Sequence, residues 1–191
     1  MSGENSAPVR CFWANPKNPL YLRYHDEEWG VPCHDDHQLY EMLLLESFQA
    51  GLSWEIILNK REAFRAAFDG FDLDTVCDYD EAKIDAMMTD PGIVRNRRKL
   101  ECAVKNSRIF RDIQAEYGSF DAFLWGFTSG EVLIETDPAV TTNALSERIS
   151  AELKRRGMKF VGSTIIFSYL QAVGVIFSHS EDCFCYQRFK R

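Results

Sequence analysis

One acidic residue, Glu46, interrupts an otherwise apolar helical stripe. Leu39, Met42, Leu43, Glu46 and Ala50 recur at intervals of three and four, which places them on one face of a helix. A carboxylate on a buried face costs free energy unless it is paired or lines a cavity. Two interpretations remain open at this point: a structural Glu with a buried Arg partner, or a pocket for a planar, electron-poor ligand.

A large aromatic residue follows closely. Ser53 is a favourable N-cap, so a second helix is expected to begin at Trp54, after a tight Ala-Gly-Leu-Ser turn. Upstream, a helical turn across Tyr21–Trp29 would gather Tyr, His and Trp side chains on one side. Aromatic rings and one acid are therefore expected near each other.

A basic turn forms a second chemical feature. Asp90-Pro91-Gly92 separates two helical patterns, and four cations follow within residues 95–99. This arrangement predicts a helix-hairpin-helix at about 89–99, in which the free amides at the start of the second helix bind phosphate. The alternative is an ordinary turn with a solvated basic face. We favour DNA-backbone binding, because the cations are concentrated in an otherwise acidic protein.

Cysteine and histidine residues at the two ends of the chain form a third feature. Cys11 and His25 lie near the start, and His179 and Cys183 lie near the end with a spacing at which two ligands can share a metal. Two ligands from each end would make a closed Cys2His2 zinc site of structural type. From spacing alone, four unrelated residues are the alternative.

Helices must position all three features. Helical patterns are expected over 36–50, 54–68, 72–77, 81–88, 95–117, 120–127, 142–157 and 163–177, with Asp35 or Asp36 as the cap of the first of these. Residues 130–139 are expected to form a loop. No alternating strand pattern and no repeat is present, so the sequence predicts an all-α fold.

Composition limits the class of protein. The chain has 191 residues, 46% of them hydrophobic, and a net charge of −7, which argues against wholesale nonspecific binding to nucleic acid. Residues 151–191 carry +4, so residues 1–150 carry −11 and a local basic face is possible. The six scattered cysteines do not suggest a disulfide scaffold. We expect residues 1–9 to be a disordered leader, residues 10–191 to be one domain, and the protein to be cytoplasmic, without a membrane span.

Together, ordered motifs from about Arg10 to Tyr186 strongly resemble the DNA-3-methyladenine glycosylase I family of the helix-hairpin-helix superfamily. The motifs are Arg10-Cys11-x-Trp13, Pro19-Leu20-Tyr21-x-x-Tyr24-His25-Asp26-x-Glu28-Trp29-Gly30, Leu45-Glu46-x-x-Gln49-Ala50-Gly51-Leu52-Ser53-Trp54, Gly92-Ile93-Val94-Arg95-x-Arg97-x-Lys99, Lys159-Phe160-Val161-Gly162-Ser163-Thr164 and His179-x-x-x-Cys183-x-Cys185-Tyr186.

The resemblance implies a role for each matched residue. Glu46 matches the pocket carboxylate, which in its ionised form would accept hydrogen bonds from the base and act in catalysis. The implied base-binding aromatics are Tyr24 and Trp54, which would sandwich the base, and Trp13 and Tyr21, which would form the wall. The implied structural zinc ligands are Cys11, His25, His179 and Cys183, and the implied DNA-backbone contacts are Gly92, Val94, Arg95, Arg97 and Lys99.

The same resemblance implies an activity. The expected enzyme flips an alkylated base out of duplex DNA and hydrolyses its glycosidic bond, releasing 3-methyladenine without cleaving the strand. A cationic base would be attracted by electron-rich rings and needs no strong acid catalysis. A monomer is expected. Other superfamily members use an Asp about twenty residues after the hairpin; Asp112 lies there but matches no family motif, so we interpret it as a surface residue.

One departure from the family pattern concerns the pocket, and two other functions are alternatives. Ser47 and Phe48 replace small or polar residues, so Phe48 is expected to reshape the pocket floor. A metal-dependent phosphohydrolase is the first alternative, suggested by the His/Asp pairs at 25–26 and 34–37. The second is a zinc-stapled helical module that binds DNA without catalysis.

Overall fold

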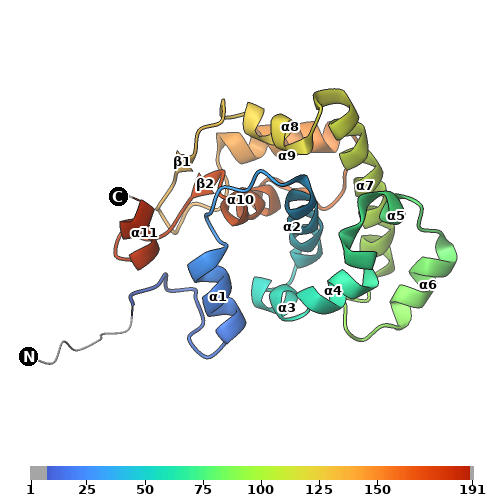
Figure 1. The fold of residues 1–191 in the computed structure, drawn as a ribbon, viewed down its shortest axis with the longest axis horizontal. Helices are drawn as coiled ribbons and strands as arrows, with labels where there is room; N and C mark the ends of the chain where they lie inside the picture. Colours follow the sequence, from blue (N-terminus) through green and yellow to red (C-terminus); the bar gives the residue numbers. More distant parts are fainter. Residues whose placement is uncertain (1–7, 190–191) are drawn as a thin grey trace, which may run out of the picture.

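The computed structural model describes residues 8–189, which fold into a mainly helical structure (Figure 1). Its helices are α1 (Pro19–Glu27), α2 (Asp36–Gln49), α3 (Trp54–Asn59), α4 (Arg61–Ala67), η1 (Asp69–Phe71, a 3₁₀ turn), α5 (Leu73–Cys77), α6 (Glu81–Thr89), α7 (Arg97–Tyr117), α8 (Phe120–Gly126), α9 (Ala144–Arg155), α10 (Ser163–Ala172) and α11 (Phe184–Phe189). Two short strands, β1 (Leu133–Ile134) and β2 (Ile176–Phe177), pair in parallel.

The helix α2 lies at the centre of the fold, against α10 on one side and α7 on the other (Figure 1). Every residue from 39 to 48 is buried, so α2 is a core helix rather than a helix with one apolar stripe. A polar side chain on such a helix has no route to solvent. It must be paired within the protein or face a cavity.

Side-chain caps fix the entry to α2 and α8. Asp35 caps α2, because its carboxylate accepts a hydrogen bond from the amide of Gln38 at 2.8 Å. The neighbouring Asp36 instead accepts from the amides of Phe120 and Asp121 at the start of α8, each at 2.8 Å. Of the two predicted caps, Asp35 is therefore the one that serves α2.

Three boundaries differ from the sequence prediction. The helix expected over 54–68 is divided at Lys60 into α3 and α4, and Ser53 makes no side-chain capping bond. The last apolar helix ends at Ala172, because Gly174 adopts a φ of +72° and packs against the backbone of Val31. The following residues form β2, which pairs with part of the predicted loop at 130–139.

A helix-hairpin-helix is present, as predicted. It consists of α6, the loop from Asp90 to Asn96, and α7. Asn96 caps α7 by accepting from the amide of Lys99, so α7 begins at Arg97, two residues later than expected. At the other end, Gly118 takes a φ of +87° and ends the helix.

The chain ends contact each other through the described residues. The amide of Phe184 donates to the carbonyl of Val9 at 2.9 Å, so the predicted disordered leader does not extend to Val9. The rest of that prediction, residues 1–7, lies outside the described residues. Within residues 8–189, no helix is long and apolar enough to cross a membrane.

Candidate active site and metal centre

A cavity of about 170 Å³ lies where α1, α2, α3 and α10 meet. It contains all five residues for which sequence analysis predicted a role in base binding or catalysis. The lining residues are Trp13, Tyr21, Tyr24, Trp29, Glu46, Gln49, Trp54, Ser168 and Gln171.

The acid of this cavity, Glu46, differs from the other buried acid on the same helix. Glu41 is 3% exposed and accepts hydrogen bonds from Arg61 at 2.6 Å and Arg65 at 3.1 Å. Glu46 is 2% exposed, and its Oε2 has no hydrogen-bond partner among residues 8–189. The structural interpretation, a Glu with a buried Arg partner, therefore describes Glu41 and not Glu46.

Burial determines the protonation of Glu46. Because desolvation disfavours the charged form, it raises the pKa of the carboxyl from 4.5 to about 8. With no cation against it, the carboxyl therefore favours its protonated form at neutral pH in the empty cavity. A positively charged ligand in the cavity would lower the pKa again and favour the carboxylate.

Two more unpartnered polar atoms belong to the same cavity. The Oε1 of Gln49 and the Nε1 of Trp54 are buried without a hydrogen-bond partner among the described residues. Together with Glu46 in its ionised form, they offer two acceptors and one donor within a single aromatic enclosure. Unpartnered buried polar groups are uncommon in folded proteins, and three around one cavity indicate a site for a polar ligand.

The aromatic walls are in contact with one another. The ring centroids of Tyr24 and Trp54 are 5.3 Å apart, with the planes tilted by 45°, and Trp13 lies 5.3 Å from Tyr21 and 4.7 Å from Trp29. A base held between two rings, at a van der Waals separation of about 3.5–4.0 Å from each, needs the two rings about 7–8 Å apart. In this conformation, Tyr24 and Trp54 are adjoining walls rather than an open sandwich.

Phe48 does not contribute to the cavity. It is 1% exposed and packs against Phe64 and Phe68, with ring centroids 4.8 and 5.8 Å away. Two residues along a helix correspond to a rotation of about 200°, so Phe48 and Glu46 face opposite sides of α2. The expected reshaping of the pocket floor by Phe48 is therefore wrong, and Ser47 bonds the carbonyl of Leu43 within the helix.

The hairpin residues divide into three groups. Arg95 is exposed, and its amide and that of Val94 have no acceptor among residues 8–189. Arg97 is half exposed and paired with Asp85. The amide of Gly92 donates to Asp90 at 2.7 Å, so it is already bonded within the turn.

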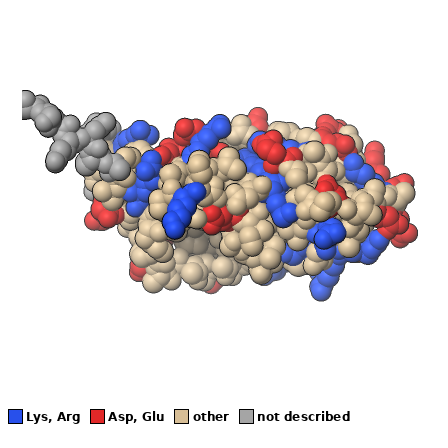
Figure 2. All heavy atoms as spheres, turned by 90° about the horizontal axis from the view of Figure 1, so that it is seen from below, with Lys and Arg blue, Asp and Glu red and all other residues tan. Residues whose placement is uncertain are grey.

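Lys99 does not lie on the surface of the hairpin. It is 7% exposed, and its ammonium donates to the carbonyls of Phe48 at 2.8 Å and Ala50 at 2.6 Å. In this structure, the Lys99 ammonium therefore does not lie at the hairpin surface, where the predicted phosphate contact would be made, because the side chain reaches inward to α2. Figure 2 shows Lys and Arg side chains interspersed with Asp and Glu across the lower face, on the left and in the middle as well as on the right, where α6 and α7 lie.

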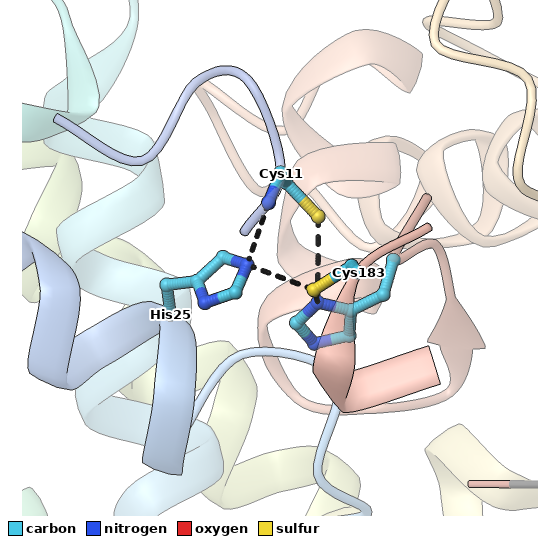
Figure 3. Close-up of side chains that lie close together, drawn as sticks. Cys11, His25 and Cys183 are labelled. Atoms are coloured by element: carbon cyan, nitrogen blue, oxygen red, sulfur yellow. Dashed lines mark hydrogen bonds between the residues drawn. The ribbon is translucent and has the colours of Figure 1, made fainter. Parts of the chain in front are cut away.

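The four predicted metal ligands do come together. Cys11, His25, His179 and Cys183 are all buried, and their ligand atoms lie within 4.8 Å of one another. The Sγ of Cys183 is 3.5 Å from both His25 Nε2 and His179 Nδ1, and the Sγ of Cys11 is also 3.5 Å from His179 Nδ1. Figure 3 shows Cys11, His25 and Cys183 pointing toward one another from the N-terminal loop, α1 and the C-terminal segment.

A second set of groups orients the two imidazoles. His25 Nδ1 is 2.8 Å from Asp26, which Arg10 holds with two hydrogen bonds, and His179 Nε2 is 3.0 Å from the carbonyl of Trp29. In each ring, the other nitrogen faces the cluster. Burial lowers the pKa of His179 to about 4, so its ring is neutral, as a metal ligand must be.

The remaining histidines do not support a phosphohydrolase. His34 pairs with Asp121 at 2.7 Å, and His37 bonds the carbonyl of Gly70 at 2.8 Å; both are exposed. Neither joins a His/Asp cluster in the described part of the chain. Asp112 is exposed, as predicted for a surface residue.

Four residues of the cavity had no predicted role. Two of them, Gln49 and Trp29, belong to motifs that match the family. Ser168 and Gln171 are polar interruptions of the apolar tract at 165–177, and their spacing of three places them on one face of α10. This spacing could have indicated that Ser168 and Gln171 line a cavity, because polar residues on one face of a buried helix line either a cavity or a polar contact.

Comparison with known proteins agrees with this geometry. Residues 13–186 match the methyladenine glycosylase family. The chain is 39% identical over 181 residues to DNA-3-methyladenine glycosylase 1 of Escherichia coli, covering 93% of this chain and 96% of that protein, and 36% identical to DNA-3-methyladenine glycosylase of Haemophilus influenzae, covering 93% and 97%.

Solved structures give the same result. A crystal structure of 3-methyladenine DNA glycosylase I superposes with a TM-score of 0.89 at 39% identity, covering 93% of this chain and 99% of that one. The Staphylococcus aureus enzyme, described for its recognition of 3-methyladenine, superposes with a TM-score of 0.85 at 39% identity, covering 88% and 92%. Sequence, fold and cavity thus agree, and the chain belongs to the methyladenine glycosylase family.

Proposed function

We propose that this protein is a DNA repair glycosylase that flips 3-methyladenine out of alkylated duplex DNA and hydrolyses its glycosidic bond. One observation carries the proposal: a fully buried carboxyl group, with an unpartnered oxygen, stands in a cavity walled by aromatic rings. The activity of its relatives, which are named for 3-methyladenine, supports the same substrate.

The cavity suits a cationic base in two ways. Methylation at N3 gives adenine a positive charge, and the faces of Trp and Tyr rings attract cations. The charge also favours ionisation of Glu46, whose oxygens would then accept hydrogen bonds from donors on the base edge. Because the alkylated base leaves readily, positioning and charge stabilisation suffice without a strong general acid.

The chemistry balances as a simple hydrolysis. Water adds to C1′ of the deoxyribose and releases one proton to the solvent, while the bond from C1′ to the base breaks and its electron pair neutralises the departing base. The cavity is lined by no lysine among the described residues, so no amine is in place to form a Schiff base with the sugar. The product would be an intact strand with one abasic site.

The hairpin would dock the DNA. Unbonded amides at Val94 and Arg95 precede a 21-residue helix, whose N-terminus favours an anion. Arg95 and Arg97 would add charge at the same place. Gly92 would contribute by permitting the tight turn of the hairpin, since a Cβ at this position would come within 2.9 Å of Ala63.

The metal cluster fits zinc. At bond lengths of about 2.3 Å to sulfur and 2.0 Å to nitrogen, a tetrahedral zinc ion separates its sulfur and nitrogen ligands by about 3.5 Å. Three of the four sulfur–nitrogen distances in the cluster are 3.5 Å. Four protein ligands leave no position for water, so Zn²⁺ would be structural, and it would hold Trp13 and Trp29 beside the base cavity.

The decisive experiment for this function uses methylated duplex DNA. The protein is incubated with DNA treated with a methylating agent, the released bases are separated, and the strands are examined before and after alkali. Release of 3-methyladenine with strands that break only after alkali supports the proposal. DNA binding without base release would instead identify a non-catalytic zinc-stapled module, and release with immediate strand cleavage would contradict the hydrolytic mechanism.

A further inference from the structure

We propose that Lys99 is a positioning residue that sets the geometry of the base cavity from the DNA-docking hairpin. This role rests on the proposed function and connects two parts of the protein, the DNA-docking hairpin and the base cavity. Lys99 lies in the first turn of α7, directly after the hairpin, yet its ammonium ends beneath the turn between α2 and α3.

The contacts of Lys99 complete the end of α2. The last carbonyls of a helix have no partner within it and carry a partial negative charge. Helix α2 has no basic residue in its own last turn, and its C-cap, Ala50, is non-helical. Lys99 supplies the missing cation and donates to the carbonyls of Phe48 and Ala50, at 2.8 and 2.6 Å.

These carbonyls flank the polar groups of the cavity. Gln49 stands between them, Glu46 lies half a turn earlier, and Trp54 begins α3 after the turn at Gly51. All three unpartnered polar atoms that line the cavity are thus within five residues of a carbonyl bonded by Lys99. A shift of residues 46–54 would therefore move the polar groups of Glu46, Gln49 and Trp54 together relative to a bound base.

The contact between Lys99 and the end of α2 depends on the charged ammonium group and not only on the hydrocarbon chain of the side chain. Burial lowers the pKa of Lys99, because it penalises the charged ammonium. Two charge-assisted hydrogen bonds offset this cost, and the ring of Phe160, with its centroid 5.7 Å from Nζ, adds a favourable face. Without the ammonium, the two carbonyls would lose their donor.

The test compares Lys99→Met with Lys105→Met. Lys105 lies on the same helix, is exposed and its side chain makes no hydrogen bond to any residue within 8–189, so its replacement removes the same charge without removing a hydrogen bond. Single-turnover release of 3-methyladenine is measured against enzyme concentration. We expect Lys99→Met to lower the rate at saturation at least tenfold, with an unchanged half-saturation value and salt dependence, and Lys105→Met to match the wild type.

Further measurements separate this role from simple destabilisation. Lys99→Arg keeps a cation and donors, and it is expected to restore most of the saturating rate. Affinity for free 3-methyladenine, followed by tryptophan fluorescence without DNA, should fall in Lys99→Met when the sample is shown to be folded by circular dichroism.

Two results would overturn the inference. One is a folded Lys99→Met protein with the wild-type saturating rate and base affinity. The other is weaker binding of Lys99→Met to undamaged duplex DNA, with a smaller slope of log affinity against log salt concentration. That result would show that Lys99 contacts phosphates. Failure of the wild type itself to release the base would instead reject the proposed function.

Discussion

At the scale of single residues, the two buried acids of α2 differ in their partners. Both Glu41 and Glu46 occupy a helix that is buried on all sides. Arg61 and Arg65 of α4 donate hydrogen bonds to Glu41, whereas the Oε2 of Glu46 has no hydrogen-bond partner among residues 8–189. Glu46 is therefore the acid that is free to bind a ligand in the cavity.

The protonation of Glu46 makes the activity depend on pH. A carboxyl with a pKa of about 8 is protonated below that pH, so the ionised fraction rises tenfold per pH unit up to about 8. We expect kcat/KM, which reports on the free enzyme, to rise with pH along this limb and level off above it. The saturating rate should level off at lower pH, because the cationic base lowers the pKa in the complex.

The measurement is a series of single-turnover rates between pH 5.5 and 9, at low and at saturating enzyme. Asp112→Asn provides a control, because this exposed acid lies outside the cavity. A kcat/KM that is flat over pH 6–8, in wild type and control alike, would show that ionisation of Glu46 does not govern binding of the base.

At the scale of elements, the sequence predicted helices better than their ends. The Pro-Gly turn and the basic run correctly predicted α6, the hairpin and α7. The cap at Asn96 moved the start of α7 past Arg95, and a single break at Lys60 divided the helix expected over 54–68 into α3 and α4. Both are decided by hydrogen bonds and packing around one or two residues, which hydrophobic spacing does not record.

The hairpin gives a prediction for DNA affinity. Arg95→Ala should weaken binding to undamaged duplex and reduce the slope of log affinity against log salt by about one. Arg97→Ala should have a smaller effect, because Asp85 already offsets its charge. Fluorescence anisotropy over a salt series checks both.

Arg111→Ala is the matched control, since Arg111 is exposed in the far half of α7 and pairs with Asp74. If Arg95→Ala and Arg111→Ala show the same affinity and the same salt slope as the wild type, the hairpin is not the docking element.

At the scale of the whole molecule, the Cys/His cluster joins the two ends of the chain beside the aromatic cavity. Cys11 and His25 meet Cys183 and His179 although about 150 residues separate the pairs. The ligand types were readable in the sequence, but their meeting depends on the path of every helix between them. Spacing alone left a shared zinc site and four unrelated residues as alternatives, and the resemblance to a family favoured the shared site.

Loss of one ligand should therefore affect the whole fold. We expect Cys183→Ser to lower zinc content and to reduce stability by roughly 3 kcal/mol, which corresponds to a fall in Tm of about 6–12 °C for a chain of this size. Metal analysis and thermal unfolding provide the readouts. Cys102→Ser is the control, because Cys102 lies on α7 outside the cluster. Wild-type zinc content and Tm in Cys183→Ser would contradict the zinc site.

The most direct test of the central claim is the single-turnover release of 3-methyladenine by Glu46→Gln. The replacement keeps the shape of the side chain but removes its charge, so it should cost about 1.5–3 kcal/mol, or about 10- to 100-fold in rate. Asp112→Asn, which removes one negative charge at the surface, should match the wild type. A Glu46→Gln protein that releases the base at the wild-type rate would show that the buried carboxylate does not carry the reaction.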